Sequence, residues 1–284
     1  MDGTEGLSRF PLARRGMVMS GLISGFTLAV TPVEAQVIHT DTFGINGGAV
    51  KIPVADGDMP AYASKPNGPG PFPIILVNEE IFGVHEHIKD LCRRLAKAGY
   101  LAVAPEVYAR EGDLSKMTDV QQIVSQVINK TPDAQMLSDL DAAVAWAGQN
   151  GGDLSRLGVT GFCRGGRNTW QYDAHSAQVK AAVAWYGPIK GPTSDIQPKT
   201  AFDVAAEIHG PLLGLYGGKD TSINVSDVEA AAEKARAAGK IVEIHIYEDA
   251  PHGFNADYRP SYRKADAEDG WARMLAWFKK YGVA

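Results

Sequence analysis

The chain contains 284 residues, 45% of them hydrophobic, and has a formal net charge of −5. This length is enough for one substantial α/β core or two small ones. The mild acidity gives no indication of nucleic acid or an anionic membrane surface as a partner. The chain has two cysteines, Cys92 and Cys163, which cannot form a disulfide framework.

Residues 1–35 are predicted to be an export signal and not part of the fold. Arg14-Arg15 precede an uncharged stretch of apolar and small residues, and Val-Glu-Ala at 33–35 offers the small side chains that a signal peptidase reads. The paired arginines indicate twin-arginine export. We therefore expect a periplasmic or secreted protein without stable membrane association after cleavage. An uncleaved extension or a membrane tether is the alternative, and without a signal the protein would be cytoplasmic.

Residues 36–284 are predicted to form a single α/β domain. An antiparallel edge hairpin is expected first, with strands at 50–54 and 59–63. Apolar runs then alternate with helical patterns, which predicts a mostly parallel sheet with helices on both faces. The predicted strands are 74–77, 101–104, 157–160, 179–185, 211–216 and 242–247, and the predicted helices are 85–98, 117–129, 134–148, 164–176, 202–207, 225–238 and 261–281.

The pattern Gly161-x-Cys163-x-Gly165 lies between the predicted strand 157–160 and the helix that follows it. It is the pattern of a nucleophile elbow with cysteine in place of serine. The strand reverses sharply into the helix, so the flanking residues must be small and the nucleophile lies above the sheet edge. The first helical turn would favour a thiolate and present the N–H of Arg164 to an oxyanion. The alternative is a buried cysteine at a strand–helix junction.

A thiol nucleophile needs a base, and the base needs a group that orients it. Asp220 follows the predicted strand 211–216, and His252 follows the strand 242–247 after a short loop. Because the carboxyl ends of parallel strands share one edge of a sheet, Cys163, Asp220 and His252 can converge. Their order along the chain is the one expected for the α/β-hydrolase fold. Asp220 or His252 alone could be an ordinary loop residue.

Four segments in this order resemble the dienelactone hydrolase (carboxymethylenebutenolidase) family of the α/β-hydrolase superfamily. They are Glu80-Ile-Phe-Gly-Val84, Gly161-Phe-Cys-Arg-Gly-Gly166, the Tyr-Gly-Gly-Lys-Asp segment that ends at Asp220, and Pro251-His-Gly-Phe254. The resemblance implies a Cys-His-Asp hydrolase that cleaves a lactone or ester without a cofactor. It also implies that Glu80 contacts the resting thiol and helps to control its ionisation. The N–H of Ile81 would complete the oxyanion hole.

The substrate of this family carries a carboxylate held by arginines, which implies a small anionic lactone or ester as the partner. The segment 105–110 matches the family segment with one of these arginines, so Arg110 is a candidate substrate-binding residue, with Tyr108 as a pocket wall. The family's second arginine falls where this chain has Ala256. Arg259, three residues further on, is the candidate replacement.

Arg164 stands beside the predicted nucleophile, where the family usually has an apolar residue. Its cation could favour the thiolate and bind an anionic substrate, or it could turn to solvent or pair with an acid. No metal site is expected, because His85 and His87 lie two residues apart at a helix start, where their rings would diverge. The oligomeric state is left open, with a monomer favoured.

Three alternatives to a lactone-specific hydrolase remain. The loss of the second family arginine makes a general carboxylesterase of the same fold plausible. A redox-active thiol at Cys163 would need a resolving partner, and Cys92 is predicted to lie in the core of helix 85–98. A non-catalytic binding module would not need an intact nucleophile, acid and histidine.

Overall fold

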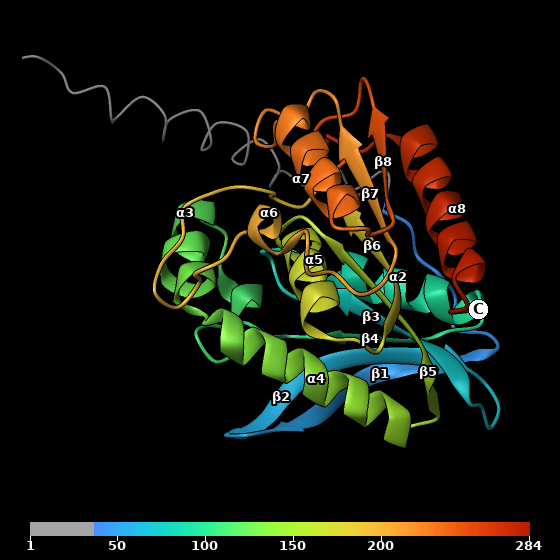
Figure 1. Cartoon of the computed structure of the whole chain (residues 1–284). Coiled ribbons are helices and arrows are strands. Elements are labelled where there is room, and N and C mark those ends of the chain that lie inside the picture. The colour runs from blue at the N-terminus through green and yellow to red at the C-terminus, as the bar shows by residue number, and fades with distance from the viewer. Residues whose placement is uncertain (1–36) are drawn as a thin grey trace, which may run out of the picture.

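The computed structural model describes residues 37–284, so the predicted export signal lies outside the described residues. An eight-stranded sheet has the strand order β1-β2-β4-β3-β5-β6-β7-β8 (Figure 1). The pairings β1–β2 and β2–β4 are antiparallel and the others are parallel. The strands are β1 (Ile45–Val54), β2 (Gly57–Pro66), β3 (Phe72–Asn78), β4 (Leu101–Pro105), β5 (Gly152–Phe162), β6 (Val179–Trp185), β7 (Leu212–Gly217) and β8 (Val242–Tyr247).

Helices cover both faces of this sheet, which confirms the predicted α/β-hydrolase architecture. In Figure 1, α4, α5 and α7 lie in front of the sheet, while α2 and α8 lie on its other side. Among residues 37–284, no helix combines the length and apolar composition that a membrane crossing requires. The α-helices are α2 (Glu86–Lys97), α3 (Val120–Gln122), α4 (Asp133–Gln149), α5 (Arg164–His175), α6 (Ala201–Val204), α7 (Val225–Ala237) and α8 (Lys264–Lys280).

The helix predicted over 117–129 is replaced by a series of short turns. A 3-10 turn η1 (Leu114–Lys116) precedes α3, a π-helical turn η2 (Ile123–Val127) follows it, and the 3-10 turn η3 (Ile128–Lys130) ends the series. This segment is rich in Val and Ile, whose β-branched side chains lose freedom in a regular helix. The hydrophobic spacing of this segment is helical, but its backbone is irregular.

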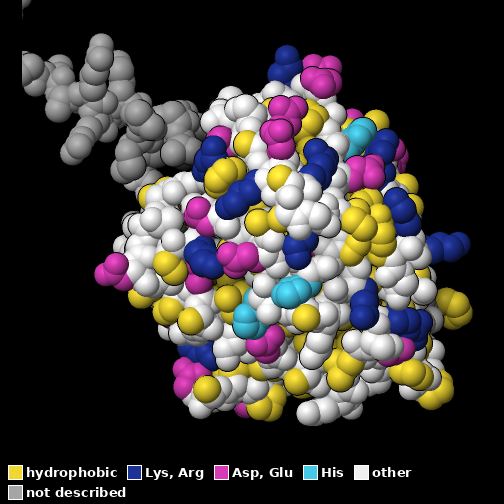
Figure 2. Space-filling model, in the orientation of Figure 1, with side chains coloured by type: hydrophobic (Ala, Val, Ile, Leu, Met, Phe, Trp, Pro, Cys, Tyr) yellow, Lys and Arg dark blue, Asp and Glu magenta, His cyan; other side chains and the backbone are white. Residues whose placement is uncertain are grey.

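The N-terminal hairpin is longer than predicted. β1 and β2 pair over their full length, from Ile45 opposite Pro66 to Val54 opposite Gly57. The apolar run of β3 is fully buried, as expected for a central strand covered on both faces, and Cys92 is buried within α2. Acidic and basic side chains intermingle on the face shown in Figure 2, in keeping with the mild net charge.

The order of the strands places the candidate site. The chain leaves β3 toward β4 on one side and later leaves β5 toward β6 on the other side. Adjacent strands whose connections depart in opposite directions leave a crevice at their carboxyl ends. Glu80 follows β3 and Cys163 follows β5, so both residues lie at this point.

Candidate active site

Cys163 joins β5 to α5 in a backbone conformation that L-residues rarely adopt. Its φ is 54° and its ψ is −120°. Such a conformation costs on the order of 1–3 kcal/mol and persists only where the surroundings hold it. Here the N–H of Cys163 donates to Trp185 O at 3.1 Å, and its carbonyl accepts from Gly166 N at 2.9 Å. The strain and its restraints are those of a nucleophile elbow.

The glycines on either side of Cys163 are required by close backbone approach. A Cβ atom on Gly161 would overlap the carbonyl of Gly165, and one on Gly165 would overlap the carbonyls of Asn78 and Glu79. The end of β3 therefore lies directly against the first turn of α5. This contact brings the segment after Asn78, which contains Glu80 and the N–H of Ile81, to the elbow.

His252 and Asp220 form a close pair at the neighbouring strand ends. His252 Nδ1 donates to Asp220 Oδ2 at 2.7 Å. The other oxygen, Oδ1, accepts from Ser222 N at 2.8 Å, from Ser222 Oγ at 2.6 Å and from Ile223 N at 3.2 Å. The carboxylate is thus oriented by the loop that follows it. Burial alone would raise the pKa of Asp220, but its bonds to His252 and Ser222 lower it.

His252 also interacts with Cys163. Burial by itself would lower the pKa of His252, but the charge and hydrogen bond of Cys163, together with Asp220, raise the pKa to about 10. The raised pKa means that His252 readily holds a proton when Cys163 is ionised. The structure therefore brings Cys163, His252 and Asp220 into one chain of contacts, in the arrangement that their order in the sequence predicted.

Glu80 is completely buried beside this chain of contacts. Its Oε2 accepts from Tyr258 Oη at 2.8 Å and lies 3.1 Å from His85 Nε2. Its Oε1 lies 3.6 Å from Arg259 Nη2. Burial would raise the pKa of Glu80, but the charge of Arg259 and the contact with His85 hold it well below its usual range. Glu80 is therefore an ionised carboxylate.

The adjacent Glu79 has the opposite character. Its side chain is buried, and desolvation together with the charge of Glu106 raises its pKa well above the ordinary value. Successive side chains of an extended segment point in opposite directions, so Glu79 faces Gly83 and the cavity beside Tyr108, away from the Glu80 partners. The pKa values of the two neighbouring carboxyls are thus shifted in opposite directions because their environments differ.

Arg259 shares the buried space around Glu80. The residue is 1% exposed, its Nε donates to Tyr258 Oη at 2.9 Å, and its guanidinium lies 4.9 Å from the centre of the Phe82 ring. Within residues 37–284, neither terminal nitrogen of this guanidinium has a hydrogen-bond partner. Burial would lower the pKa of Arg259, but the charges of Glu80 and Cys163 raise it. The structure thus places this candidate substrate-binding arginine against Glu80.

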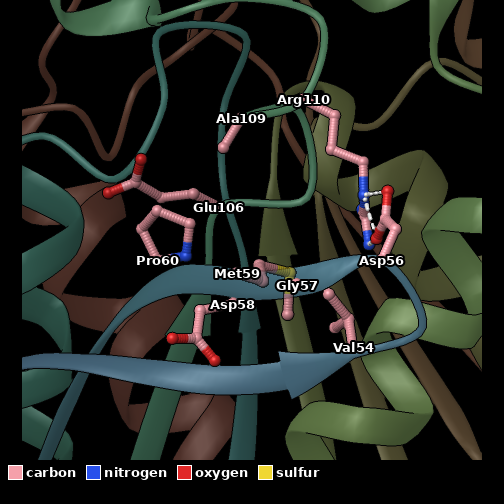
Figure 3. A pocket seen from close by; sticks show the side chains of 9 residues that line it. All are labelled: Val54, Asp56, Gly57, Asp58, Met59, Pro60, Glu106, Ala109 and Arg110. Atoms are coloured by element: carbon pink, nitrogen blue, oxygen red, sulfur yellow. Dashed lines mark hydrogen bonds and ion pairs between the residues drawn. The ribbon is translucent and has the colours of Figure 1, made fainter.

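Arg110 occupies a different environment, on the rim of a cavity of about 260 Å³ next to the β1–β2 turn (Figure 3). Its Nε donates to both oxygens of Asp56 at 2.8 Å, and its terminal nitrogens bond to Asp139 of α4. Two carboxylates therefore already neutralise the guanidinium. A substrate carboxylate would have to displace one of them.

The side chain of Arg164 is bonded to Gln197. Its Nη2 donates to Gln197 Oε1 at 2.9 Å, and Gln197 is itself held by the carbonyls of Ile128 and Thr131. Burial and the nearby Arg167 lower the pKa of Arg164. The partner is thus an amide, whereas the sequence had suggested that the cation favours the thiolate and binds an anionic substrate, or that it turns to solvent or pairs with an acid. The N–H of Arg164 remains in the first helical turn, where backbone donors have no intrahelical acceptor.

Tyr108 is a buried residue that contacts the same helix. It is 2% exposed, and its hydroxyl accepts from Asn168 Nδ2 at 2.9 Å. Its ring also lines the cavity that contains Glu79 and Leu114. Tyr108 lines a cavity that lies next to the segment after β3, and its role as a wall of the substrate pocket stays a prediction.

The expectation that the rings of His85 and His87 diverge is wrong. The two rings stack with their centroids 6.1 Å apart and their planes 17° apart. His85 is the N-cap of α2 and has an extended backbone, so the helical spacing that separates residues two apart does not apply to it. Within residues 37–284, no three His, Cys, Asp or Glu side chains gather as metal ligands would.

Sequence reasoning missed several residues around the site. Tyr186 has a φ of 37°, and its ring meets that of His252 edge-on with the centroids 5.2 Å apart. Its buried hydroxyl has no hydrogen-bond partner within residues 37–284. Ser222 holds the carboxylate of Asp220, and His85 and Tyr258 hold that of Glu80. Only Ser222 could have been found from the local sequence. It lies two residues after Asp220, and an aspartate side chain commonly accepts a hydrogen bond from the backbone two residues further on.

The sheet topology and the nucleophile elbow define an α/β-hydrolase. Residues 59–282 match the model of the dienelactone hydrolase family, and the chain belongs to this family. It is a hydrolase of the carboxymethylenebutenolidase-like class.

The relatives and a solved structure agree with this assignment. A protein of Methylorubrum extorquens named "Putative carboxymethylenebutenolidase" is 57% identical over 96% of this chain and 94% of its own. An Escherichia coli protein of the same name is 52% identical over 91% of this chain and 96% of its own. The crystal structure of a "Putative Dienelactone Hydrolase" from Klebsiella pneumoniae has a TM-score of 0.81 and 52% identity, over 84% of this chain and 99% of that one.

Proposed function

We propose that this protein hydrolyses a lactone or ester through a covalent thiol ester on Cys163. The thiol passes its proton to His252, and the sulfur attacks the carbonyl carbon. The tetrahedral intermediate collapses to the thiol ester, and His252 returns the proton to the leaving oxygen. His252 then takes a proton from water, and the resulting attack releases the acid and restores the thiol. Asp220 orients His252 throughout.

The interaction of His252 with both Asp220 and Cys163 is the observation that carries this proposal. Its Nδ1 bonds to Asp220 at 2.7 Å, and Cys163 contributes to the raised pKa of the imidazole. A histidine that bridges a buried carboxylate and an elbow cysteine has the geometry of a general base. A redox-active thiol would not need this pair, and Cys92, its only possible partner in the sequence, is fully buried within α2.

The N–H groups of Ile81 and Arg164 would stabilise the oxyanion. The close approach of Gly165 to the carbonyls of Asn78 and Glu79 supports this proposal, because it brings the two backbone segments together. Donors placed in advance where negative charge develops contribute typically about 3–4 kcal/mol each to lowering the barrier. The side chain of Arg164 is held by Gln197 and is not needed for this role.

An anionic substrate would find its cation at Arg259. Within residues 37–284 the terminal nitrogens of Arg259 make no hydrogen bond, although Nη2 forms an ion pair with Glu80 Oε1 at 3.6 Å. Arg110 is hydrogen-bonded to two carboxylates, those of Asp56 and Asp139. A carboxylate-bearing lactone held by Arg259 is therefore the substrate class that we favour.

A general carboxylesterase is the second candidate, and the pairing of Arg110 with two carboxylates favours it. If this guanidinium is unavailable and Ala256 replaces the family's second arginine, selection for an anionic substrate would rest on Arg259 alone. A neutral ester would then also fit the site. The two candidates share the same chemistry and differ only in how strongly the substrate carboxylate is recognised.

Steady-state hydrolysis of a carboxylate-bearing dienelactone and of a neutral aryl ester tests these proposals. We expect Cys163→Ala to abolish both activities with the fold intact, and unchanged turnover would refute the covalent mechanism. Cys163→Ser should lose most of the rate, because a serine hydroxyl is far less acidic than a thiol.

The same two substrates separate the candidates when Arg110→Ala is compared with the wild type. A preference for the anionic lactone that is lost in this variant would assign substrate binding to Arg110. A preference that persists would leave that role to Arg259. Equal activity on the neutral ester would indicate a general carboxylesterase. Arg156→Ala is the matched control, because Arg156 also pairs with a surface aspartate, Asp153.

A further inference from the structure

A second cavity of about 260 Å³ lies beside the segment that follows β3. Its wall comes from four parts of the chain, namely that segment, the start of α2, the segment after β4 and the turn η1. Glu106 borders both this cavity and the one at the β1–β2 turn, and in Figure 3 its carboxylate points away from Arg110. Ligand pockets begin at roughly 300 Å³, so a cavity of this size suits a small molecule.

The carboxyl group of Glu79 lies at the inner wall of this second cavity. The residue is 1% exposed, and within residues 37–284 neither carboxyl oxygen has a hydrogen-bond partner. Its Oε2 would lie 3.7 Å from a Cβ atom on Gly83, which also lines the cavity. Most buried polar groups in folded proteins are paired. An unpaired buried carboxyl at the edge of a cavity therefore points to a ligand from outside the chain.

The charges around the cavity leave Glu79 without a counter-ion. Asp113 also lines the cavity, and it pairs with Lys116 at 2.7 Å. Glu106 faces Lys89, whose charge lowers the pKa of Glu106 against the larger effect of burial. Burial and the charge of Glu106 raise the pKa of Glu79 well above its ordinary value, and nearby backbone N–H groups offset this only in part. The group that Glu79 lacks is a cation.

The other side chains at the cavity do not supply this cation. Burial lowers the pKa of His85, whose Nε2 lies 3.1 Å from Glu80, and burial raises the pKa of Tyr108, so both stay neutral. Val84 and Leu114 give the wall an apolar part. Within residues 37–284 no three metal-ligating side chains gather, so the cavity suits an organic cation better than a metal ion.

We propose that this cavity binds a small primary amine in its ammonium form, with the ammonium group on Glu79 and the alkyl part against Val84 and Leu114. On binding, the proton of the Glu79 carboxyl leaves to solvent, and the carboxylate accepts a hydrogen bond from an N–H of the ammonium. Glu106 adds a second negative charge at the same cavity. The inference goes beyond the proposed ester hydrolysis and does not depend on it.

Isothermal titration calorimetry of the intact chain with propylammonium chloride tests this inference. Propionamide is the neutral counterpart, with N–H groups but no charge. Titrations at about pH 7 in phosphate and in HEPES, which differ in their heats of ionisation, report the protons released. Glu79→Gln replaces the carboxyl by an amide of the same shape. Glu207→Gln is the matched control, because Glu207 is exposed and pairs with Lys199.

We expect the wild type to bind propylammonium more tightly than propionamide and to release protons as it does so. Glu79→Gln should weaken propylammonium binding by about tenfold or more, because it removes a charge-assisted hydrogen bond. Glu207→Gln should bind as the wild type does. The affinity should rise with pH near neutrality, because the ammonium competes with the proton on Glu79.

Unchanged propylammonium binding in Glu79→Gln would overturn the inference. Equal heats in the two buffers, or tighter binding of propionamide, would overturn it as well. A thermal melt of each protein checks the fold, and Glu106→Gln, a change at a half-buried side chain, tests the same charge a second time. This variant should weaken binding several-fold, and unchanged binding would contradict the role of the acids. Cys163→Ala should leave all titrations unchanged, so the hydrolysis and the amine site fail separately.

Discussion

The substitution Asp220→Asn tests the orientation of the catalytic histidine with little change in shape. Oδ1 of Asp220 accepts two backbone N–H bonds, from Ser222 and Ile223, and one from the Ser222 hydroxyl. An asparagine would keep its carbonyl oxygen on these donors, which leaves the NH2 group facing His252 Nδ1. Because an NH2 group only donates, Nδ1 would have to accept, and the ring proton would move to Nε2.

A histidine in that tautomer cannot take a proton from the thiol of Cys163 at Nε2. The loss of the Asp220 carboxylate also removes one of the causes that raise the pKa of His252. The Asp-to-Asn change in a catalytic triad reduces kcat roughly 10⁴-fold. This corresponds to about 5.5 kcal/mol of transition-state stabilisation.

The assay is steady-state hydrolysis of an aryl ester, with a thermal melt of each protein. The matched control is Asp249→Asn, which removes an exposed carboxylate 3.8 Å from Lys219. A melting temperature close to the wild type would show that the amide kept its contacts with the loop. A kcat of Asp220→Asn within about tenfold of the wild type would refute the tautomer argument.

Three further predictions concern the elbow, a buried carboxyl and export. Gly161→Ala should destabilise the protein by about 1–3 kcal/mol or more in urea unfolding, because its methyl group would overlap the Gly165 carbonyl; unchanged stability would contradict the elbow packing. Burial raises the pKa of Asp173 to about 8, so the folded state keeps a proton that the unfolded chain releases, and stability should fall as the pH rises from about 4 to 8. Asp173→Asn should weaken this fall, and equal pH dependence of the two proteins would argue against it. Replacing Arg14-Arg15 by two lysines should leave the protein in the cytoplasm on fractionation if the segment is a twin-arginine signal.

The sequence by itself determined the fold class and the order of the candidate catalytic residues. Strand and helix periodicities are local properties, so β6 and β8 were predicted at their observed bounds. The elbow pattern around Cys163 is also local, and parallel strands bring their carboxyl ends to one edge in any such sheet. The convergence of Asp220 and His252 on that edge could therefore be expected from spacing alone.

Only the tertiary structure decided the surroundings of the charged groups. Arg110 reaches Asp56 at a hairpin turn and Asp139 on α4, residues distant in the sequence that come together only in the folded chain. The partners of Glu80 come from the start of α2 and from the loop after His252. Long side chains pair with whatever charge lies within a few ångströms, and no local pattern encodes that neighbour. The sequence thus predicted a candidate nucleophile, acid and base, while packing between distant segments raises the pKa of Glu79 and lowers that of Glu80.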